Sequence, residues 1–215
     1  MLLENYITAK LEGQKEGYDI KTVDEDNYEH FYILFRPLAG IYKDQFHILE
    51  MKTEYGHGAD KTTFPYNAPY IKFNTLVYHT NISTNGAICL DILKDKNKWA
   101  PTYDFSSIIR NILLLFEEPN NASPFNGEAS RAYVDCEKKY KESKDKRMTF
   151  KEEEALKARC FTNFKAHADK HAKANDKELT NTYSKWFPQL VGKQPDAEEL
   201  EELKTMLESM KLKKK

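Results

Sequence analysis

The chain has 215 residues, of which 40% are hydrophobic and 31% are charged, so it is long enough for one well-buried domain with an appendage and too short for two full domains. Its 33 basic residues nearly balance 34 acidic ones, and the formal net charge is -1. This balance excludes the global electrostatic attraction typical of proteins that bind nucleic acid or anionic membranes. We therefore expect no nucleic-acid partner and no membrane partner.

The hydropathy pattern predicts neither a membrane-spanning nor an exported protein. The longest apolar run, residues 112–116, is far shorter than the roughly 20 residues that a membrane-spanning helix needs, and the chain does not start with the apolar core of a signal peptide. The three cysteines, Cys89, Cys136 and Cys160, show no metal-binding spacing, and their odd number argues against a disulfide framework. We expect a soluble protein with free thiols in the cytoplasm, with the nucleus as a further location.

The first part of the chain has the pattern of an α+β unit. Residues 1–12 are expected to form a helix that Gly13 and Gly17 close. Three segments rich in aromatic and β-branched residues lie between turn signals and predict antiparallel strands: residues 29–36, 44–52 and 69–74. Residues 55–68, which contain many turn formers, are expected to form a surface loop.

Helices are expected to follow the strands. After an irregular stretch at residues 75–103, residues 104–118 carry apolar side chains on one helical stripe, with Asp104 as the N-cap and Pro119 as the stop. A second helix is expected to start near Asn126. Its inner face would consist of Ala129, Tyr133, Cys136 and Tyr140.

The composition changes again near residue 148, after which charged residues dominate a helical pattern. We therefore divide the chain into a core domain, residues 1–148, and a helical C-terminal extension, residues 149–215. An amphipathic last helix is expected after an Asp196 cap. The extension either folds back on the domain or docks on a partner, and its candidate anchors are Trp186, Phe187 and Leu190.

The most informative stretch is residues 78–101, where Cys89 stands between Ile88 and Leu90 among many turn formers. On these residues alone, a small buried hydrophobe is the more common role of such a cysteine, and a nucleophile is the alternative. A cysteine protease would need a histidine base, and none of the six histidines has a recognisable protease context. The local pattern leaves the role of the thiol open.

Several spaced motifs around this cysteine resemble the core of the ubiquitin-conjugating enzymes. They follow the order of that family and nearly its spacing: His79-Thr80-Asn81, Gly86 to Leu93 around Cys89, Trp99-Ala100-Pro101, Glu118-Pro119-Asn120 and Ser123-Pro124-Phe125-Asn126. Departures from the family are Thr80 in place of a proline, a longer loop at residues 55–63, and two extra residues before Trp99. The resemblance covers about residues 28–140. It implies an α+β ubiquitin-conjugating fold, in which a four-stranded antiparallel meander is flanked by an N-terminal helix and C-terminal helices, here with an extra helical C-terminal extension.

The resemblance also implies an acyltransferase that works through a cysteine thioester. In this family an activating enzyme, which consumes ATP, delivers ubiquitin to the cysteine, and the ubiquitin is then transferred to a lysine amine of a protein substrate, usually with a ubiquitin ligase. Cys89 matches the acceptor cysteine, and neither a bound cofactor nor a metal is implied. The alternatives are a conjugating enzyme for another ubiquitin-like protein such as SUMO, and a non-catalytic ubiquitin-binding scaffold.

Further site residues follow from matching family positions. Asn81 would donate a hydrogen bond to the oxyanion or pin the loop beside it, with a simple Asx-turn residue as the alternative. Asp91 and Ser123 would orient the attacking lysine and ease its deprotonation, with a turn carboxylate and a helix cap as the alternatives. Phe125 would form an apolar wall beside Cys89, with an ordinary core residue as the alternative.

Two loops match the surfaces through which family members contact the activating enzyme and the ligase. The matching residues are Tyr66, Pro101 and Thr102. An exposed aromatic side chain suits a small, transient interface of this kind. Trp99 and His79 are expected to be structural.

Overall fold

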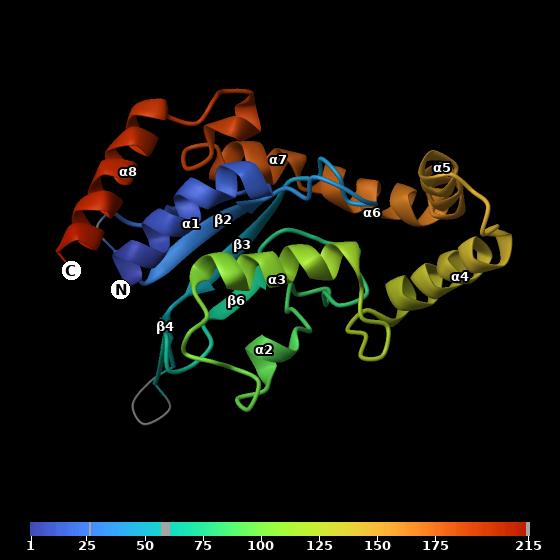
Figure 1. Cartoon of the computed structure of the whole chain (residues 1–215), viewed down its shortest axis with the longest axis horizontal. Coiled ribbons are helices and arrows are strands. Elements are labelled where there is room, and N and C mark those ends of the chain that lie inside the picture. Colours follow the sequence, from blue (N-terminus) through green and yellow to red (C-terminus); the bar gives the residue numbers. More distant parts are fainter. Residues whose placement is uncertain (26, 57–60, 214–215) are drawn as a thin grey trace.

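The first helix, α1 (Leu2–Glu16), lies beside the first strands of a sheet in the computed structural model (Figure 1). The prediction that this helix closes at Gly13 is wrong. A Cβ on Gly13 would come within 2.5 Å of the Tyr18 carbonyl oxygen, so this glycine lets the following strand pack closely against the helix. The helix ends at Gly17, whose φ of 88° suits a residue without a Cβ. The structure describes residues 1–25, 27–56 and 61–213.

Four antiparallel strands form the main sheet, in the order in which they occur in the chain. They are β1 (Tyr18–Thr22), β2 (His30–Phe35), β3 (His47–Lys52) and β6 (Tyr70–Phe73). In the register of the sheet, Ile33 lies between Ile20 and Leu49, and Leu49 lies opposite Phe73. The predicted four-stranded antiparallel meander is confirmed, although sequence analysis did not locate β1.

A small hairpin lies within the segment that was predicted to be a loop. β4 (Glu54–Tyr55) pairs with β5 (Thr62–Thr63), while residues 57–60 of the predicted loop lie outside the described residues. The loop prediction is therefore wrong for the paired positions. Strands of two residues are too short to show an alternating pattern, so the turn formers around them dominated the interpretation.

Helix α3 (Phe105–Glu117) packs its apolar stripe on the inner face of the sheet. The helix ends two residues before Pro119, as predicted. Rings interlock across the interface, with Phe35 and Phe73 of the sheet lying 4.8 and 5.6 Å from Phe116 between ring centres. The buried members of the stripe are Phe105, Ile108, Ile109, Ile112 and Phe116. Burial of these side chains is the main force that holds α3 on the sheet.

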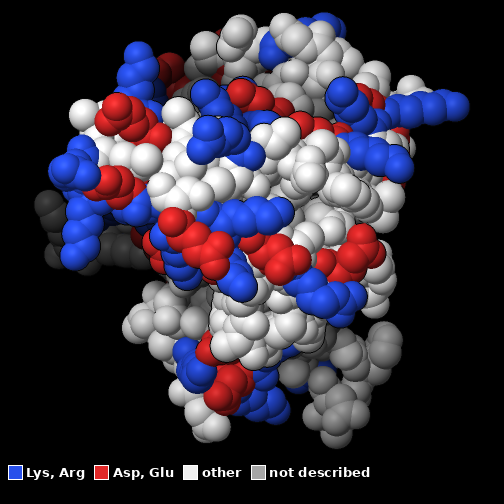
Figure 2. Space-filling model, turned by 90° about the vertical axis from the view of Figure 1, so that its right-hand side faces the viewer, with Lys and Arg blue, Asp and Glu red and all other residues white. Residues whose placement is uncertain are grey.

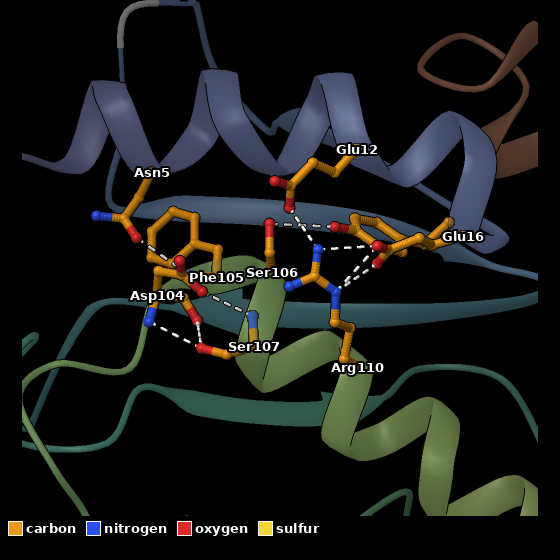
Figure 3. A network of polar contacts seen from close by, with 9 residues as sticks. Asn5, Glu12, Glu16, Asp104, Phe105, Ser106, Ser107 and Arg110 are labelled. Atoms are coloured by element: carbon orange, nitrogen blue, oxygen red, sulfur yellow. Dashed lines mark hydrogen bonds and ion pairs between the residues drawn. The ribbon is translucent and has the colours of Figure 1, made fainter. Parts of the chain in front are cut away.

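Polar contacts fix the start of α3 and tie the helix to α1 (Figure 3). The predicted cap is confirmed, because the Asp104 carboxylate accepts a hydrogen bond from the Ser107 N–H at 2.7 Å, and the Asp104 N–H donates to the Ser107 hydroxyl at 2.9 Å. One turn further along, Arg110 forms ion pairs at 2.8 Å with Glu12 and Glu16 of α1. These charges are exposed, so each pair contributes at most about 1 kcal/mol.

Helix α4 (Gly127–Ser143) follows, and it begins where the sequence predicts, after Asn126. The remaining elements are α5 (Phe150–Cys160), α6 (Thr162–Ala174), α7 (Asp176–Glu178), the π-helical turn η2 (Leu179–Tyr183), the 3-10 turn η3 (Pro188–Val191) and α8 (Ala197–Leu212). None of the described helices is both long and apolar enough to cross a membrane. On the face near α4, α5 and α6, basic and acidic side chains are interspersed (Figure 2).

The extension folds back over the outer face of the sheet, and α7 and the turns after it are drawn above β2 and β3 in Figure 1. Phe187 is completely buried there in a cluster with Leu34 of β2 and Ile48 of β3. The ring of Tyr32 packs edge-on against Trp186, with 4.9 Å between ring centres. Of the two alternatives for the extension, packing on the domain is therefore the one observed, and Trp186 and Phe187 act as anchors within the chain.

The last helix, α8, runs beside α1 and closes this side of the fold (Figure 1). Glu199 of α8 forms an ion pair with Lys21 of β1. Beneath α1, Lys10 and Asp19 form a buried ion pair, and Gln189 of the extension donates a hydrogen bond to the Asp19 carboxylate at 2.7 Å. The hydrogen bond of Gln189 and the ion pair of Glu199 therefore couple the extension to the core.

Candidate active site

Cys89 lies in the irregular segment that follows β6, and backbone contacts hold this segment against the sheet. The N–H of Phe73 in β6 donates a hydrogen bond to the Gly86 carbonyl oxygen at 2.8 Å. A Cβ on Gly86, whose φ is 85°, would lie only 1.8 Å from the Phe73 carbonyl oxygen, so glycine is required for this approach. The Cys89 N–H then donates to the Asn81 carbonyl oxygen at 2.8 Å, which places the thiol beside Asn81.

Two polar groups from different elements surround the Cys89 thiol, whose residue is 6% exposed. The Ser123 hydroxyl, in the loop before α4, lies 3.6 Å from Sγ. The Lys94 amine, at the end of the one-turn helix α2 (Asp91–Lys94), donates a hydrogen bond to Sγ at 3.1 Å. The thiol therefore has polar neighbours on two sides, unlike a cysteine packed only against apolar side chains.

Lys94 is a residue at this site that sequence analysis missed. A signal for it was present, because it stands five residues after Cys89, and the residues between them can form a single helical turn. The motifs drew attention to family positions, and Lys94 is not one of them. The contact depends on the helical turn of α2, which places the Lys94 amine next to the Cys89 sulfur.

Asn81 is fully buried and holds the loop that carries Ser123. Its side-chain Nδ2 donates hydrogen bonds to the Asn120 and Ser123 carbonyl oxygens at 2.7 and 3.3 Å, and its Oδ1 accepts one from the Asn120 N–H at 2.8 Å. Both ends of the amide are thus engaged with backbone groups of one loop. The geometry is that of a residue that pins the loop next to the thiol.

His79 supports Asn81 from within the core. Its Nδ1 accepts a hydrogen bond from the Asn81 N–H at 2.9 Å, so Nε2 carries the proton and donates to the Leu115 carbonyl oxygen at 3.0 Å. The imidazole also stacks on Phe116, with 4.6 Å between ring centres. Burial lowers the pKa of His79 to about 3, which keeps the ring neutral at physiological pH.

Asp91 and Phe125 lie at the exposed rim of the site. The Asp91 carboxylate forms an ion pair with Lys98, and both side chains are more than half exposed. The Phe125 ring is 40% exposed, and its face lies 3.4 Å from the Lys94 amine. Among the residues that the structure describes, no group of His, Cys, Asp and Glu side chains is arranged to hold a metal ion.

The three residues expected to contact partner proteins are all exposed. Tyr66 has 79% of its surface accessible, and Pro101 and Thr102 lie in an exposed turn before α3. Trp99 links the two segments, because its indole N–H donates a hydrogen bond to the Pro65 carbonyl oxygen at 2.8 Å. The two loops are therefore held together on one side of the domain.

The fold and this cysteine-centred site define a protein class that comparison with known proteins identifies. A model of the ubiquitin-conjugating enzyme family matches residues 3–148, which is more than half of the chain. The chain belongs to the ubiquitin-conjugating enzyme family.

Individual relatives agree with this assignment over shorter stretches. The chain is 46% identical over 77 residues to the ubiquitin-conjugating enzyme E2 2 of Kluyveromyces lactis and to that of Saccharomyces cerevisiae, matching 36% of this chain and 46% and 44% of those proteins. It thus spans about half the length of the curated relatives that it matches. Among solved structures, the E2 domain of a Toxoplasma gondii ubiquitin conjugating enzyme is similar, with a TM-score of 0.50 and 27% identity over 62% of this chain and 83% of that one.

Proposed function

We propose that this chain is a ubiquitin-conjugating transferase that carries ubiquitin as a thioester on Cys89 and passes it to lysine amines of substrates. The observation that carries this proposal is the position of the buried Cys89 thiol, 3.6 Å from the Ser123 hydroxyl and beside the loop that Asn81 pins. Residues 1–148 would form the conjugating core, and residues 149–215 a structural extension that covers the sheet.

The chemistry consists of two acyl transfers through one sulfur. In the first, the Cys89 thiolate attacks the carbonyl carbon of the thioester on the activating enzyme, and the leaving thiolate stays with that enzyme. In the second, a neutral lysine amine attacks the carbonyl carbon on Cys89, an amide bond forms, and the Cys89 thiolate leaves. A cysteine suits both steps because its thiolate is a strong nucleophile and a good leaving group.

Neighbouring residues would serve the second transfer. Asn81 would hold the loop at the thioester, and it could donate to the developing oxyanion only by releasing the Asn120 or Ser123 carbonyl oxygen. Ser123 and Asp91 would orient the incoming amine and help it to lose its proton, and Phe125 would border the site. For Asp91 this requires that the carboxylate exchange its partner Lys98 for the substrate amine, which its exposed position allows.

Partner proteins would supply the remaining functions. An activating enzyme would consume the ATP, so the chain itself would need no bound cofactor. The exposed Tyr66, Pro101 and Thr102, held in neighbouring loops, would contact the activating enzyme and the ligase. A location in the cytoplasm or nucleus stays a prediction.

A charging assay tests the proposal. The protein is incubated with activating enzyme, ATP and ubiquitin, and the products are separated with and without a thiol reductant. We expect a reductant-sensitive adduct that Cys89→Ala abolishes and that Cys136→Ala, a matched change of another buried thiol, retains. Retention of the adduct in Cys89→Ala and its loss in Cys136→Ala would show that the assignment is wrong.

The same assay separates the modifier classes. The two extra residues between Cys89 and Trp99 raise the alternative of a SUMO-conjugating enzyme. A parallel reaction with SUMO and its own activating enzyme in place of ubiquitin tests it. Charging with SUMO and not with ubiquitin would move the chain to that branch. Absence of any charging would favour the non-catalytic scaffold.

A further inference from the structure

A cavity of about 340 Å³ lies where the extension meets the core, apart from the residues around Cys89. Its walls come from the end of α1, the start of β1, the end of β2 and the turn between η3 and α8 (Figure 1). The volume falls in the range of about 300–1,000 Å³ that is typical of small-molecule sites. The lining combines two cationic residues, Arg36 and Lys193, with three glutamines, Gln14, Gln189 and Gln194.

One buried polar atom of the lining has no partner. Gln189 donates a hydrogen bond through Nε2 to the Asp19 carboxylate at 2.7 Å, and because a carboxylate accepts, this contact fixes which end of the amide faces Asp19. The other end, Oε1, is buried and receives no hydrogen bond from the described residues. Buried acceptors without a donor are rare in native proteins and cost free energy, so a ligand that donates to Gln189 Oε1 would supply what the folded chain lacks.

Two positive charges at the same cavity have no acidic partner. Within the described ranges, neither Arg36 nor Lys193 forms an ion pair. The Arg36 guanidinium lies 5.8 Å from the centre of the Phe46 ring, and both cationic residues are exposed, so a ligand can reach them. Asp19, the acidic residue of the lining, is already paired with Lys10. The charge of the lining therefore favours an anion.

We propose that this cavity binds a phosphate monoester that also carries hydroxyl groups, the chemistry shared by sugar phosphates and phosphorylated inositol headgroups. A dianionic phosphate matches the two positive charges of Arg36 and Lys193, and a guanidinium binds phosphate oxygens through paired N–H donors. A hydroxyl group of the ligand would donate to Gln189 Oε1. The amides of Gln14 and Gln194 can both donate and accept, as further hydroxyl groups require.

Such a ligand would connect the extension to the core. Gln14 and Arg36 belong to the core, whereas Gln189 and Lys193 belong to the extension, so a molecule bound among them contacts both parts. A ligand that binds only the folded chain stabilises it by mass action, and saturation of this cavity should therefore raise the Tm of the protein. The inference does not depend on thioester formation at Cys89.

Calorimetric titration of the full chain at low ionic strength tests the site. The probe is ribose phosphorylated at its primary hydroxyl, and we expect a Kd below about 1 mM, with weaker binding of unphosphorylated ribose and of inorganic phosphate. Arg36→Gln and Lys193→Gln should each weaken binding by about tenfold or more, because each removes a charged donor. Lys177→Gln changes an exposed lysine of the extension outside the cavity and should bind like the parent.

A further variant tests the orphaned acceptor. Gln189→Leu removes Oε1, so the phosphorylated ribose should then bind no more tightly than inorganic phosphate. Circular dichroism checks that this variant is folded, and the exposed positions of Arg36 and Lys193 keep the test valid if it is not.

Sedimentation with phosphatidylcholine vesicles identifies the source of the ligand. Capture only by vesicles that contain a phosphoinositide, lost in Arg36→Gln, would support the site with a lipid headgroup as ligand, and binding of the phosphorylated ribose without capture would support a soluble ligand. The inference is overturned if neither probe binds, because the cavity would then hold only water. Equal binding by the parent and by Arg36→Gln combined with Lys193→Gln would also overturn it, as would equal affinity of the parent for phosphorylated ribose and inorganic phosphate.

Discussion

Replacing Asn81 with alanine tests how the active-site loop is held. The side chain is completely buried and bonds to the backbone of the loop through Asn120 and Ser123. Asn81→Ala removes the amide and keeps the backbone contact with Cys89. Because the Asn81 amide bonds to the backbone of the loop that carries Ser123, whose hydroxyl lies 3.6 Å from the Cys89 thiol, the change should disturb the site without removing either group.

The cost can be worked out from the three hydrogen bonds of the amide, at 2.7, 2.8 and 3.3 Å. A hydrogen bond contributes about 1 kcal/mol net, and a buried group left without a partner costs about 1–3 kcal/mol. Water can satisfy part of the freed loop backbone, so we expect the free energy of unfolding to fall by about 2–4 kcal/mol. The total stability of a domain is roughly 5–15 kcal/mol, so the variant should still fold.

Urea denaturation followed by circular dichroism measures the stability change. Thr80→Val is the matched control, because Thr80 is equally buried and its hydroxyl has no hydrogen-bond partner among the described residues. Removing an unpartnered hydroxyl of the same shape should leave stability unchanged or raise it by about 1 kcal/mol. Comparing the free energies of unfolding of Asn81→Ala and Thr80→Val therefore separates the cost of losing a hydrogen-bonded polar group from the cost of any substitution at a buried position.

Transfer rates give a second measurement on the same variant. If the amide serves the developing oxyanion, discharge to free lysine should slow by about a hundredfold or more in Asn81→Ala, with a smaller effect on charging. The reasoning is refuted if Asn81→Ala costs no more than Thr80→Val, since the loop would then not depend on this amide. If Asn81→Ala slows charging and discharge equally, Asn81 does not serve the oxyanion and only positions the loop.

Two further predictions concern proton transfer and pH. The first is the double variant Asp91→Ala with Ser123→Ala, whose single-turnover discharge to free lysine should be slowed mostly at lower pH and recover as pH rises, because the lysine amine has a pKa of about 10.4. Charging of Cys89 should stay nearly unchanged. Discharge at the parent rate at every pH would show that Asp91 and Ser123 are only a turn carboxylate and a helix cap. Burial lowers the pKa of His47 and of His79 to about 3, so between pH 6.5 and 3 the unfolded chain binds protons that the folded chain does not. The contribution of the two neutral rings to the free energy of unfolding is therefore fully present above about pH 6.5 and is lost as pH falls toward 3. Urea denaturation at a series of pH values should show this loss of stability, and the loss should be smaller in His47→Gln.

Sequence analysis found the elements whose signals are local. The stripe and the Asp104 cap located α3 because helical spacing and capping both lie within a few residues. Gly13 misled the prediction of α1, because glycine ends many helices and only the contact with Tyr18 shows that it serves close packing here. The direction of the extension was left open, because the partner of an apolar residue such as Phe187 depends on tertiary contacts that sequence spacing does not contain.

For the candidate site, resemblance to a family supplied what spacing alone did not. Cys89 by itself has the surroundings of a buried hydrophobe, and the motifs before and after it marked it as a possible nucleophile. In the structure, the Ser123 hydroxyl lies beside the Cys89 thiol, and the Asn81 amide is hydrogen-bonded to the loop that carries Ser123. Lys94 and the Asp91 partner Lys98 depend on how α2 turns, so no motif indicated them.

The covering of the outer face of the sheet has a consequence for how this protein is synthesised. When residues 1–148 have left the ribosome, the whole segment that matches the family is present, yet one side of its sheet still lacks its cover. Leu34 and Ile48 would face water until Phe187 and the residues around it emerge. The order of synthesis therefore makes completion of the sheet a late event, and a nascent chain that pauses after residue 148 would present an apolar surface for chaperones to bind.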